Sequence, residues 1–438
     1  MRLTWVQPED LLSHQLVQAR AEGIDVADVE SRWRTAGGTT DAPVSGASDE
    51  PAGGDLRVLA RELLDELDAR SAEWIAPVIP SLPVLGGSPD ADIEQRVLDA
   101  WLGRAAGNLL GKPVEKLPRE GIREILETSG QWPLTQYITA AGVPAEVLAR
   151  WPWNRRSEPT SLREVIDGMP EDDDLNFAIL ALRLVERHGD ALTTEDVALA
   201  WLDDLPAGRV FTAERVVYRN LLDGVDPLRA AVVQNPFREW IGAQIRTDVY
   251  GWVHPGDRTA AARLALTDAR LSHTGAGVDG AVWVAAMSAA ALVLDDPVEV
   301  AAAGLEAIPA DGEIARAVRF GLTLAEVELD EALDRLHSQY GHLHWVHSVN
   351  NSALTAYALT APDFATGVGR AVMAGWDTDS AGATVGAVLG AVLGVPAEWT
   401  APLDNRIATS LPGMNQVAID ELVARTVAVQ SVKGAGRD

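Results

Sequence analysis

The 438-residue sequence contains no cysteine. This absence excludes disulfide bonds, a thiolate nucleophile and a zinc site with cysteine ligands. The sequence also lacks a long apolar run: the stretch over residues 381–395 is shorter than the ~20 residues that a membrane-spanning helix needs. The first residues, Met1 to Pro8, lack the apolar segment of a signal peptide. We therefore expect a cytoplasmic protein that does not associate with membranes.

Positive charge is also scarce, and the formal net charge is −28. Such an excess of acidic groups argues against binding to the phosphate backbone of a nucleic acid, which depends on lysine and arginine. A small phosphorylated ligand remains compatible with this charge if it enters a locally positive pocket. The composition leaves the oligomeric state open.

Segments rich in alanine, leucine and valine predominate, and few stretches resemble β-strands. The sequence therefore predicts a mostly helical protein. Helices are expected within residues 8–34 and over 55–70, separated by a Gly-, Ser-, Thr- and Pro-rich linker over 35–54. A proline-spaced segment follows, and we place a domain boundary near residue 90. Residues 1–90 carry no chemical motif, so we expect this extension to lie outside any site on the 91–438 domain.

The most informative stretch begins at Gly375 and continues through an apolar segment. Glycines recur at 382, 386, 390 and 394, once per helical turn. Because residues four apart share one helix face, this spacing allows another backbone to approach closely. Each glycine costs about 1 kcal/mol of helix stability relative to alanine, and close packing would offset that cost. The pattern predicts a buried central helix.

Two carboxylates, Asp377 and Asp379, lie at the start of this predicted helix, with Ser380 near its N-cap. Neighbouring carboxylates repel each other, and one of them takes up a proton unless a cation is present. Oxygen ligands of this kind suit Mg²⁺ or Mn²⁺. An acidic cap that interacts with the helix dipole is the alternative. This motif alone leaves both interpretations open.

A second acidic turn, Glu171 to Asp174, precedes an apolar helix predicted from Ala178 to His188. Four consecutive acids exceed what an N-cap requires, although a solvated acidic turn would have the same composition. The recurrence of acids before an apolar helix favours a shared role. If the two turns converge, their carboxylates form a cluster that is difficult to hold together without cations.

Several loops are candidates for ligand binding. A helix predicted from Asp92 to Leu110 ends in a Gly- and Pro-containing loop that presents Glu115, which by itself resembles a surface charge. The segment Leu271–Ala281 is a glycine-rich loop before an Ala-rich helix, where backbone N–H groups are able to receive an anion. Residues 235–246 form a predicted loop that opens a helix. His273 alone is more typical of a structural role.

Histidine and tryptophan clusters have less specific meanings. A zinc site is one interpretation of the four neighbouring histidines, His337, His342, His344 and His347. Their spacing matches no zinc motif. The segment His347–Asn351 is more typical of a polar loop that supports a site. Trp and Arg residues between 132 and 156 would be able to stack on a base, although covering the edge of a core is the more common role.

Taken in order, four motifs resemble those of the ADP-ribosylglycohydrolase family, over residues 92–412. Gly107–Glu115 resembles Gly-Asp-x-x-Gly-x-x-x-Glu, and Asp172–Leu175 lies where the family has Thr-Asp-Asp-Thr. Ser272–Gly277 is similar to the histidine-containing substrate loop. Gly375–Ser380 resembles Gly-Gly-Asp-Thr-Asp-Thr and is the most specific of the four.

The resemblance implies an all-α, orthogonally packed helical bundle that hydrolyses the bond between ADP-ribose and its acceptor. The N-terminal, mostly helical extension lies outside the match. It also implies two bound magnesium ions, with manganese as an alternative. The metal ligands would be Asp172, Asp173, Asp174, Asp377, Asp379 and Ser380. Catalysis would involve Glu115, Asp173 and Asp377. Substrate-binding candidates are Asn108, Gly242, Gln244, Arg246, His273, Gly275, Gly277, Asn350, Asn351 and Trp376.

The sequence departs from the family pattern at the motifs themselves. Asn108 replaces an aspartate, Asp172 replaces a threonine ligand, and Trp376 replaces a glycine. Leu175 replaces a second threonine. The metal site is expected to survive these changes, while the acceptor linkage stays open: an ADP-ribosylated protein or a small molecule. The alternatives are a hydrolase of a small N-ribosyl compound, a non-catalytic ADP-ribose binder or toxin antagonist, and a helical protein whose acids only cap helices.

Overall fold

A computed structural model describes residues 3–87 and 92–435, with side chains described to residue 430. The N-terminal segment contains helices α1 (Pro8–Ala21), α2 (Ala27–Thr35) and α3 (Gly54–Arg70). The remaining α-helices are α4 (Ile93–Gly111), α5 (Arg119–Thr128), α6 (Ala145–Arg150), α7 (Glu158–Ser161), α8 (Asp173–His188), α9 (Thr194–Asp204), α10 (Thr212–Leu222), α11 (Asp248–Trp252), α12 (Arg258–Ala269), α13 (Gly275–Ala291), α14 (Pro297–Leu305), α15 (Glu313–Leu322), α16 (Leu329–Tyr340), α17 (Ser348–Ala358), α18 (Phe364–Met373), α19 (Thr378–Leu393), α20 (Ala397–Thr400) and α21 (Ile419–Ala435). Short 3-10 helices are η1 (Lys112–Val114), η2 (Gly189–Ala191), η3 (Ala207–Arg209), η4 (Ile241–Arg246) and η5 (Ala401–Leu403).

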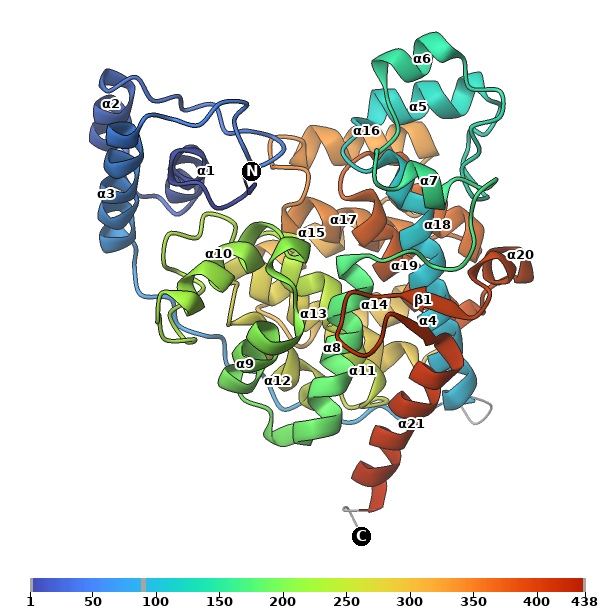
Figure 1. Cartoon of the computed structure of the whole chain (residues 1–438). Helices are drawn as coiled ribbons and strands as arrows, with labels where there is room; N and C mark the ends of the chain where they lie inside the picture. Colours follow the sequence, from blue (N-terminus) through green and yellow to red (C-terminus); the bar gives the residue numbers. More distant parts are fainter. Residues whose placement is uncertain (1–2, 88–91, 436–438) are drawn as a thin grey trace.

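The predicted all-α class is confirmed. Among the described residues, the strands are β1 (Arg406–Ala408) and β2 (Gln416–Ala418), which pair antiparallel with Ile407 opposite Val417. The helices pack around a central group that includes α4, α13 and α19, while α5, α6 and α7 lie together at one edge (Figure 1). This arrangement buries alanine, valine and leucine side chains across the whole bundle.

Helices α4 and α19 form the central pair, and glycine makes their contact close. A Cβ atom added to Gly103 or Gly107 would collide with the backbone carbonyl of Gly386 or Gly382. Gly390 lies equally close to the carbonyl of Asp99. The predicted buried helix with a close-packing glycine stripe is thus confirmed over three of its four glycines. The fourth, Gly394, instead ends α19 as its C-cap with φ +78°, and a Cβ there would meet nothing.

Two helices begin earlier than the sequence suggested. Helix α8 starts at Asp173 rather than Ala178, because the side chain of Asp172 accepts a hydrogen bond from the N–H of Asp174 and acts as the N-cap. Helix α13 begins at Gly275, inside the segment expected to be a glycine-rich loop. Acidic and glycine residues that looked like loop are therefore in the first helical turns, where their backbone N–H groups have no helical partner.

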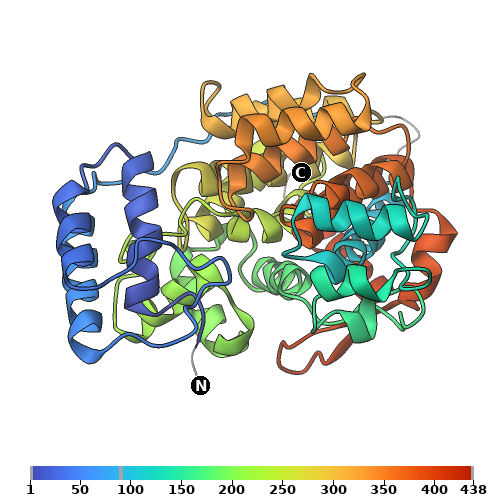
Figure 2. The same ribbon diagram turned by 90° about the horizontal axis from the view of Figure 1, so that it is seen from above.

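The N-terminal helices lie to one side of the bundle (Figure 2). The N-terminal segment contacts the bundle through a buried aromatic cluster. Trp5 packs edge-on against Phe237 and Trp240, with ring centroids 5.4 and 5.7 Å apart. The ring of His14 lies 5.5 Å from that of Trp240 and 5.9 Å from that of His344. The segment after α3 then runs along the bundle, where the N–H of Leu82 donates to Thr259 Oγ1 over 2.8 Å (Figure 1). The predicted boundary near residue 90 falls within 88–91, which lies outside the described residues.

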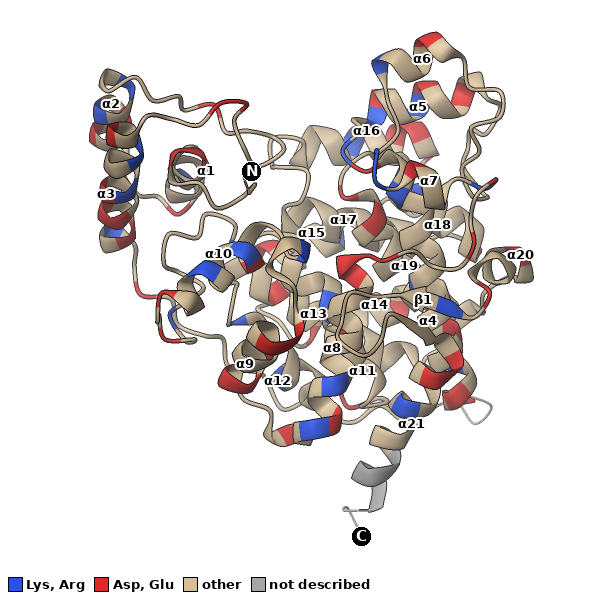
Figure 3. Cartoon of the chain, in the orientation of Figure 1, with Lys and Arg blue, Asp and Glu red and all other residues tan. Residues whose placement is uncertain are grey.

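Charged residues are distributed over most helices, with lysine and arginine scattered among the acids (Figure 3). Among the helices of the described residues, none combines the length and apolar character that a membrane span requires.

Candidate functional site

The two acidic turns meet beside the C-terminal end of α4. Asp172 and Asp174, at the start of α8, and Asp379, in the first turn of α19, each offer a carboxylate oxygen, and these oxygens lie within 4.8 Å of one another. All three residues are buried. The close packing of α4 on α19 explains this convergence, because the side chain of Thr378 donates to the carbonyl of Gly111 over 2.9 Å and fixes the start of α19 against the end of α4.

A network of donors holds the acids at α8. The Nδ2 atom of Asn108 donates to Asp172 Oδ1 over 3.1 Å and to Asp174 Oδ2 over 2.7 Å. Ser380 Oγ donates to the same oxygen of Asp174 over 3.3 Å. Asn108 replaces an acid in the family pattern, and here its amide bridges two carboxylates that would otherwise repel each other.

Three oxygens of this cluster have no hydrogen-bond partner although they are buried. They belong to three different residues: Asn108 Oδ1, Asp174 Oδ1 and Asp379 Oδ1. An unpaired buried acceptor is costly, and it is rare in folded proteins unless something else occupies the position. Carboxylate and amide oxygens are the ligands that Mg²⁺ and Mn²⁺ prefer. The residues therefore fit a divalent cation.

The pKa values of the acids at the start of α19 also indicate a site that lacks positive charge. Burial, followed by the neighbouring charges of Glu115 and Asp172, raises the pKa of Asp379 to about 7. Burial and the charge of Asp379 raise the pKa of Asp377 well above its usual range, and the two carboxyls share a hydrogen bond. Without added positive charge, these acids retain protons that a cation would displace.

The acids of the α8 turn differ from one another. Burial and the negative charge of Asp172 raise the pKa values of Asp173 and Asp174 well above the usual range. Burial also disfavours the charged form of Asp172, yet Lys112 holds the pKa of that carboxyl below its ordinary value. The N-cap acid is therefore the ionised member of this turn.

Glu115 and Asp173 are the partly exposed members of the group, whereas Asp172, Asp174 and Asp379 are buried. Glu115 directly follows η1, as the glycine- and proline-containing loop predicted. Its Oε2 accepts a hydrogen bond from Asn154 Nδ2 over 2.7 Å, and its Oε1 lies 3.3 Å from Lys116 Nζ. These contacts hold a partly exposed carboxylate beside the buried cluster, where its charge acts on Asp377 and Asp379.

Sequence reasoning missed three residues that contact the site. Lys112 pairs with Asp172, and Asn154 orients Glu115. Arg104, fully buried in α4, pairs with Asp248 and donates to the backbone carbonyl of Asp174 over 2.9 Å. Lys112 is part of the Gly107–Glu115 motif, so its position was a usable signal. Arg104 and Asn154 contact the site only in the folded chain, and no local sequence pattern predicts these contacts.

The basic and histidine side chains expected to bind substrate already have protein partners. Arg246 donates to Asp268 and to Glu214, each over 2.7 Å, and its side chain is buried. His273 is also buried, with its Nδ1 atom 2.7 Å from the hydroxyl of Ser272. These contacts make both residues part of the packing beneath the predicted substrate loops. A direct contact of either with substrate stays a prediction.

The glycine positions in these loops are places of close approach. A Cβ on Gly242 would collide with the carboxylate of Glu214, and one on Gly275 would collide with that of Glu239. Gly277 is similarly close to the carbonyl of Arg238. The N–H of Ala276 donates weakly to Glu239 over 3.4 Å, so a protein carboxylate lies at the helix start where the sequence suggested an external anion.

The remaining substrate-binding candidates occupy two neighbouring segments. Asn351 Oδ1 accepts a hydrogen bond from the N–H of Asp377 over 3.3 Å, which ties α17 to the start of α19. Asn350 is buried with an unpaired Oδ1. The ring of Trp376 stacks on His337 at 4.5 Å and is 4 % exposed. Gln244 Oε1 accepts from Ser352 over 3.2 Å. Their roles toward a substrate stay predictions.

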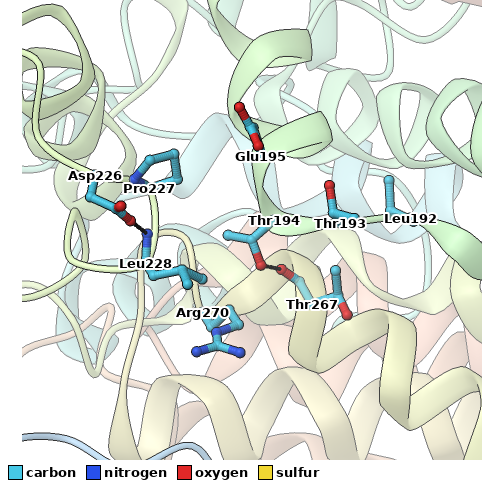
Figure 4. A pocket seen from close by; sticks show the side chains of 9 residues that line it. All are labelled: Leu192, Thr193, Thr194, Glu195, Asp226, Pro227, Leu228, Thr267 and Arg270. Carbon is cyan, nitrogen blue, oxygen red and sulfur yellow. Dashed lines mark hydrogen bonds between the residues drawn. The ribbon is translucent and has the colours of Figure 1, made fainter.

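A separate surface pocket of about 480 Å³ lies between α9, the 226–228 loop and the end of α12 (Figure 4). Two of its lining residues are joined by a hydrogen bond, in which Thr194 Oγ1 donates to the carbonyl of Thr267 over 2.8 Å. The lining residues are Leu192, Thr193, Thr194, Glu195, Asp226, Pro227, Leu228, Thr267 and Arg270. None of them belongs to the acidic cluster or to the predicted substrate loops. This pocket and the cluster of carboxylates are therefore separate sites. The acidic cluster is the better candidate because its polar groups converge.

The fold and the cluster together define a helical protein with a buried, oxygen-rich site at the meeting point of three helix ends. Residues 89–434 match the family model described as ADP-ribosylglycohydrolase, and the chain belongs to this family. An uncharacterized protein from Archaeoglobus fulgidus is 26 % identical over 320 residues, which span 72 % of this chain and 93 % of the relative. A solved structure described as an ADP-ribosylglycohydrolase-related protein complex is 21 % identical, with a TM-score of 0.49 and coverage of 78 % of this chain and 98 % of that one.

Proposed function

We propose that the protein hydrolyses the ribosyl C1″ glycosidic bond of an ADP-ribosylated acceptor and releases ADP-ribose, with help from a divalent cation. The family supports a glycohydrolase. The observation that carries the proposal is the set of unpaired buried oxygens on Asn108, Asp174 and Asp379. Helix capping accounts for Asp172, but Asp379 Oδ1 receives no helix N–H. Magnesium is the expected ion and manganese an alternative.

The cation would be held by the buried carboxylates at the start of α8 and α19 together with Asn108. When bound, it supplies positive charge that orients the ribose hydroxyls and favours deprotonation of a nearby water. The protein's own groups supply the rest. Asn108 and Ser380 keep the Asp174 carboxylate in place, and Asn351 fixes the backbone at Asp377.

Cleavage of a ribosyl C1″ bond passes through an oxocarbenium-like state and needs an acid at the leaving atom and a base at the water. Glu115 is suited to exchange a proton at the leaving atom, because it is partly exposed and is oriented by Asn154. Asp173 is partly exposed in the first turn of α8 and is suited to guide the water. Asp377 would contribute through its position at the N-cap of α19.

The decisive test is a panel of ADP-ribosylated peptides with Arg-, Ser- and Asp-linked ADP-ribose, assayed with and without Mg²⁺ for released ADP-ribose. Asp377→Ala and Asp379→Ala are expected to abolish release and to preserve the helical circular dichroism spectrum. Glu398→Ala, which removes an exposed acid from α20, is the matched control and should leave release unchanged.

Three outcomes would replace the proposal. Turnover of free N-ribosyl compounds without turnover of any modified peptide would identify a small-molecule hydrolase. Binding of ADP-ribose without turnover would identify a binder or toxin antagonist. Full activity of Asp379→Ala would return the cluster to the role of helix caps.

A further inference from the structure

Lys112 places an ammonium group inside the acidic cluster. Lysine is rare in this sequence, which contains three: Lys112, Lys116 and Lys433. Lys112 begins η1 directly after α4, and its side chain is 8 % exposed. Its Nζ atom pairs with Asp172 Oδ2. Burying an ammonium group costs free energy unless the group is paired with an opposite charge. The carboxylate of Asp172 supplies that charge here.

The pairing occupies three of the four lone-pair sites of the Asp172 carboxylate. Its Oδ2 is taken by Lys112, and its Oδ1 accepts from Asn108 Nδ2 over 3.1 Å and from the N–H of Asp174 over 3.0 Å. A metal ion at Oδ1 would have to displace a donor, and one at Oδ2 would share that oxygen with the ammonium of Lys112. Asp174 and Asp379 differ, because each retains a buried Oδ1 without a hydrogen-bond partner, although Arg104 Nη2 lies 4.0 Å from that of Asp174.

Charge compensation points the same way. The Nζ atom of Lys112 pairs with Asp172 Oδ2, so the ammonium already compensates one carboxylate charge of the cluster. A divalent cation placed at Asp172 would lie next to this ammonium and would be repelled by it. A cation placed at Asp174 and Asp379 meets the unpaired oxygens instead.

We propose that Lys112 takes the place of one of the two cations that the family resemblance implied, so that the site binds a single divalent ion, through Asp174, Asp379 and the Oδ1 atom of Asn108. This inference rests on the metal-assisted function proposed above. Asp172 then acts as the partner of Lys112 and as the N-cap of α8, which makes it a positioning residue rather than a metal ligand. Lys112 becomes a permanent cation that no chelator removes.

The experiment counts ions directly, with Mn²⁺ alone as the probe. Wild-type protein is titrated with Mn²⁺ by calorimetry, and its electron paramagnetic resonance spectrum is recorded at saturation. We expect about one ion per chain and the spectrum of isolated Mn²⁺, since repulsion by Lys112 excludes a second ion. Two ions with a spin-coupled spectrum, or none, would overturn the proposal, and this result does not depend on any variant.

Substitutions then assign the effect to the ammonium. Lys112→Met keeps the length of the side chain and removes the charge, so a second ion should enter and spin coupling should appear. Lys112→Arg keeps the charge and should retain a single ion. Lys116→Met is the matched control, because Lys116 lies four residues away and its side chain is 48 % exposed. A Lys112→Met protein that is folded by circular dichroism and still binds one ion with unchanged affinity would contradict the proposal.

Ion counting also separates this inference from the proposed function. If the protein binds one Mn²⁺ but hydrolyses no ADP-ribosylated peptide, the single-ion site is supported and the proposed hydrolysis is refuted. A protein that hydrolyses these peptides with two spin-coupled ions would do the reverse.

Discussion

Gly107 of α4 and Gly382 of α19 lie face to face, each with its backbone carbonyl where the other's Cβ would be. This contact is close to the site, since Asn108 follows Gly107 and Asp379 and Ser380 precede Gly382 by two or three residues. The distance between the two backbones therefore affects how closely Asn108 approaches Asp379 and Ser380 on α19.

We expect Gly107→Ala to separate the two helices and to destabilise the protein by about 1–3 kcal/mol, the usual cost of overpacking a well-packed core. Urea unfolding followed by circular dichroism measures this change. Because the shift also moves Asn108, the affinity for Mn²⁺ should fall. Gly54→Ala, at the start of α3 where a Cβ meets nothing, is the control and should leave both quantities nearly unchanged. Wild-type stability of Gly107→Ala would show that the helices separate without cost.

Glu115→Gln tests the proposed proton exchange at the leaving atom. The substitution preserves shape and the hydrogen bond from Asn154 but removes the charge. We expect the hydrolysis rate to fall on the order of 10²–10⁴-fold, the usual contribution of a general acid or base. Calorimetric titration with Mg²⁺ should show nearly unchanged affinity.

The matched control for this variant is Glu120→Gln, an exposed acid on α5. Turnover close to wild type in Glu115→Gln would make Glu115 a simple surface charge. Loss of metal binding would instead make it a ligand.

Stability should decrease on acidification, in part through His14. Burial lowers the pKa of His14 from 6.5 to about 4. The unfolded chain thus takes up a proton near pH 6.5 that the folded chain refuses until about pH 4. Stability is full above the unfolded pKa and falls as the pH drops through this window, by up to about 3 kcal/mol from this residue.

His14→Phe retains the ring contacts with Phe237 and Trp240 and removes the titration. Urea unfolding between about pH 4 and pH 7 should therefore show a smaller loss of stability than in the wild type. Burial also lowers the pKa values of His344 and His347, to about 3 and about 4, so part of the loss should remain. His342→Phe, at an exposed position, is the control. An unchanged pH dependence in His14→Phe would exclude His14 as its source.

Removal of residues 1–90 should destabilise the domain, although the sequence predicted an extension outside the site. Trp5 covers Phe237 and Trp240, and Gln18 donates to Glu239 over 2.8 Å. A chain that begins at residue 91 would expose this surface, so we expect a lower melting temperature and a tendency to aggregate.

Trp5→Ala in the full chain tests the same contact without truncation. It should cost about 3–5 kcal/mol, as for other buried aromatic side chains. Trp74→Ala, which removes a half-buried tryptophan from the extended segment, is the control and should cost less. A truncated chain with wild-type stability and turnover would confirm the extension as an independent addition.

Local patterns were enough to predict the helical class, the buried α19 and the two acidic turns. Helical periodicity and glycine spacing reflect which face of a helix is buried, and this depends on neighbours three or four residues away. The resemblance over the four ordered motifs added the family. It also placed Asp172, Asp174 and Asp379 in one site before their proximity was visible.

Only the tertiary structure decided the partners of these residues. Lys112 reaches Asp172 across 60 residues of sequence, and Arg104 reaches Asp248 across 144. Which donor fills each carboxylate depends on how α4, α8 and α19 pack, and no local signal encodes such a distance. The same holds for Arg246, which looked available for substrate but is occupied by Glu214 and Asp268. Charge is visible in a sequence, whereas its compensation depends on contacts that form only when the chain has folded.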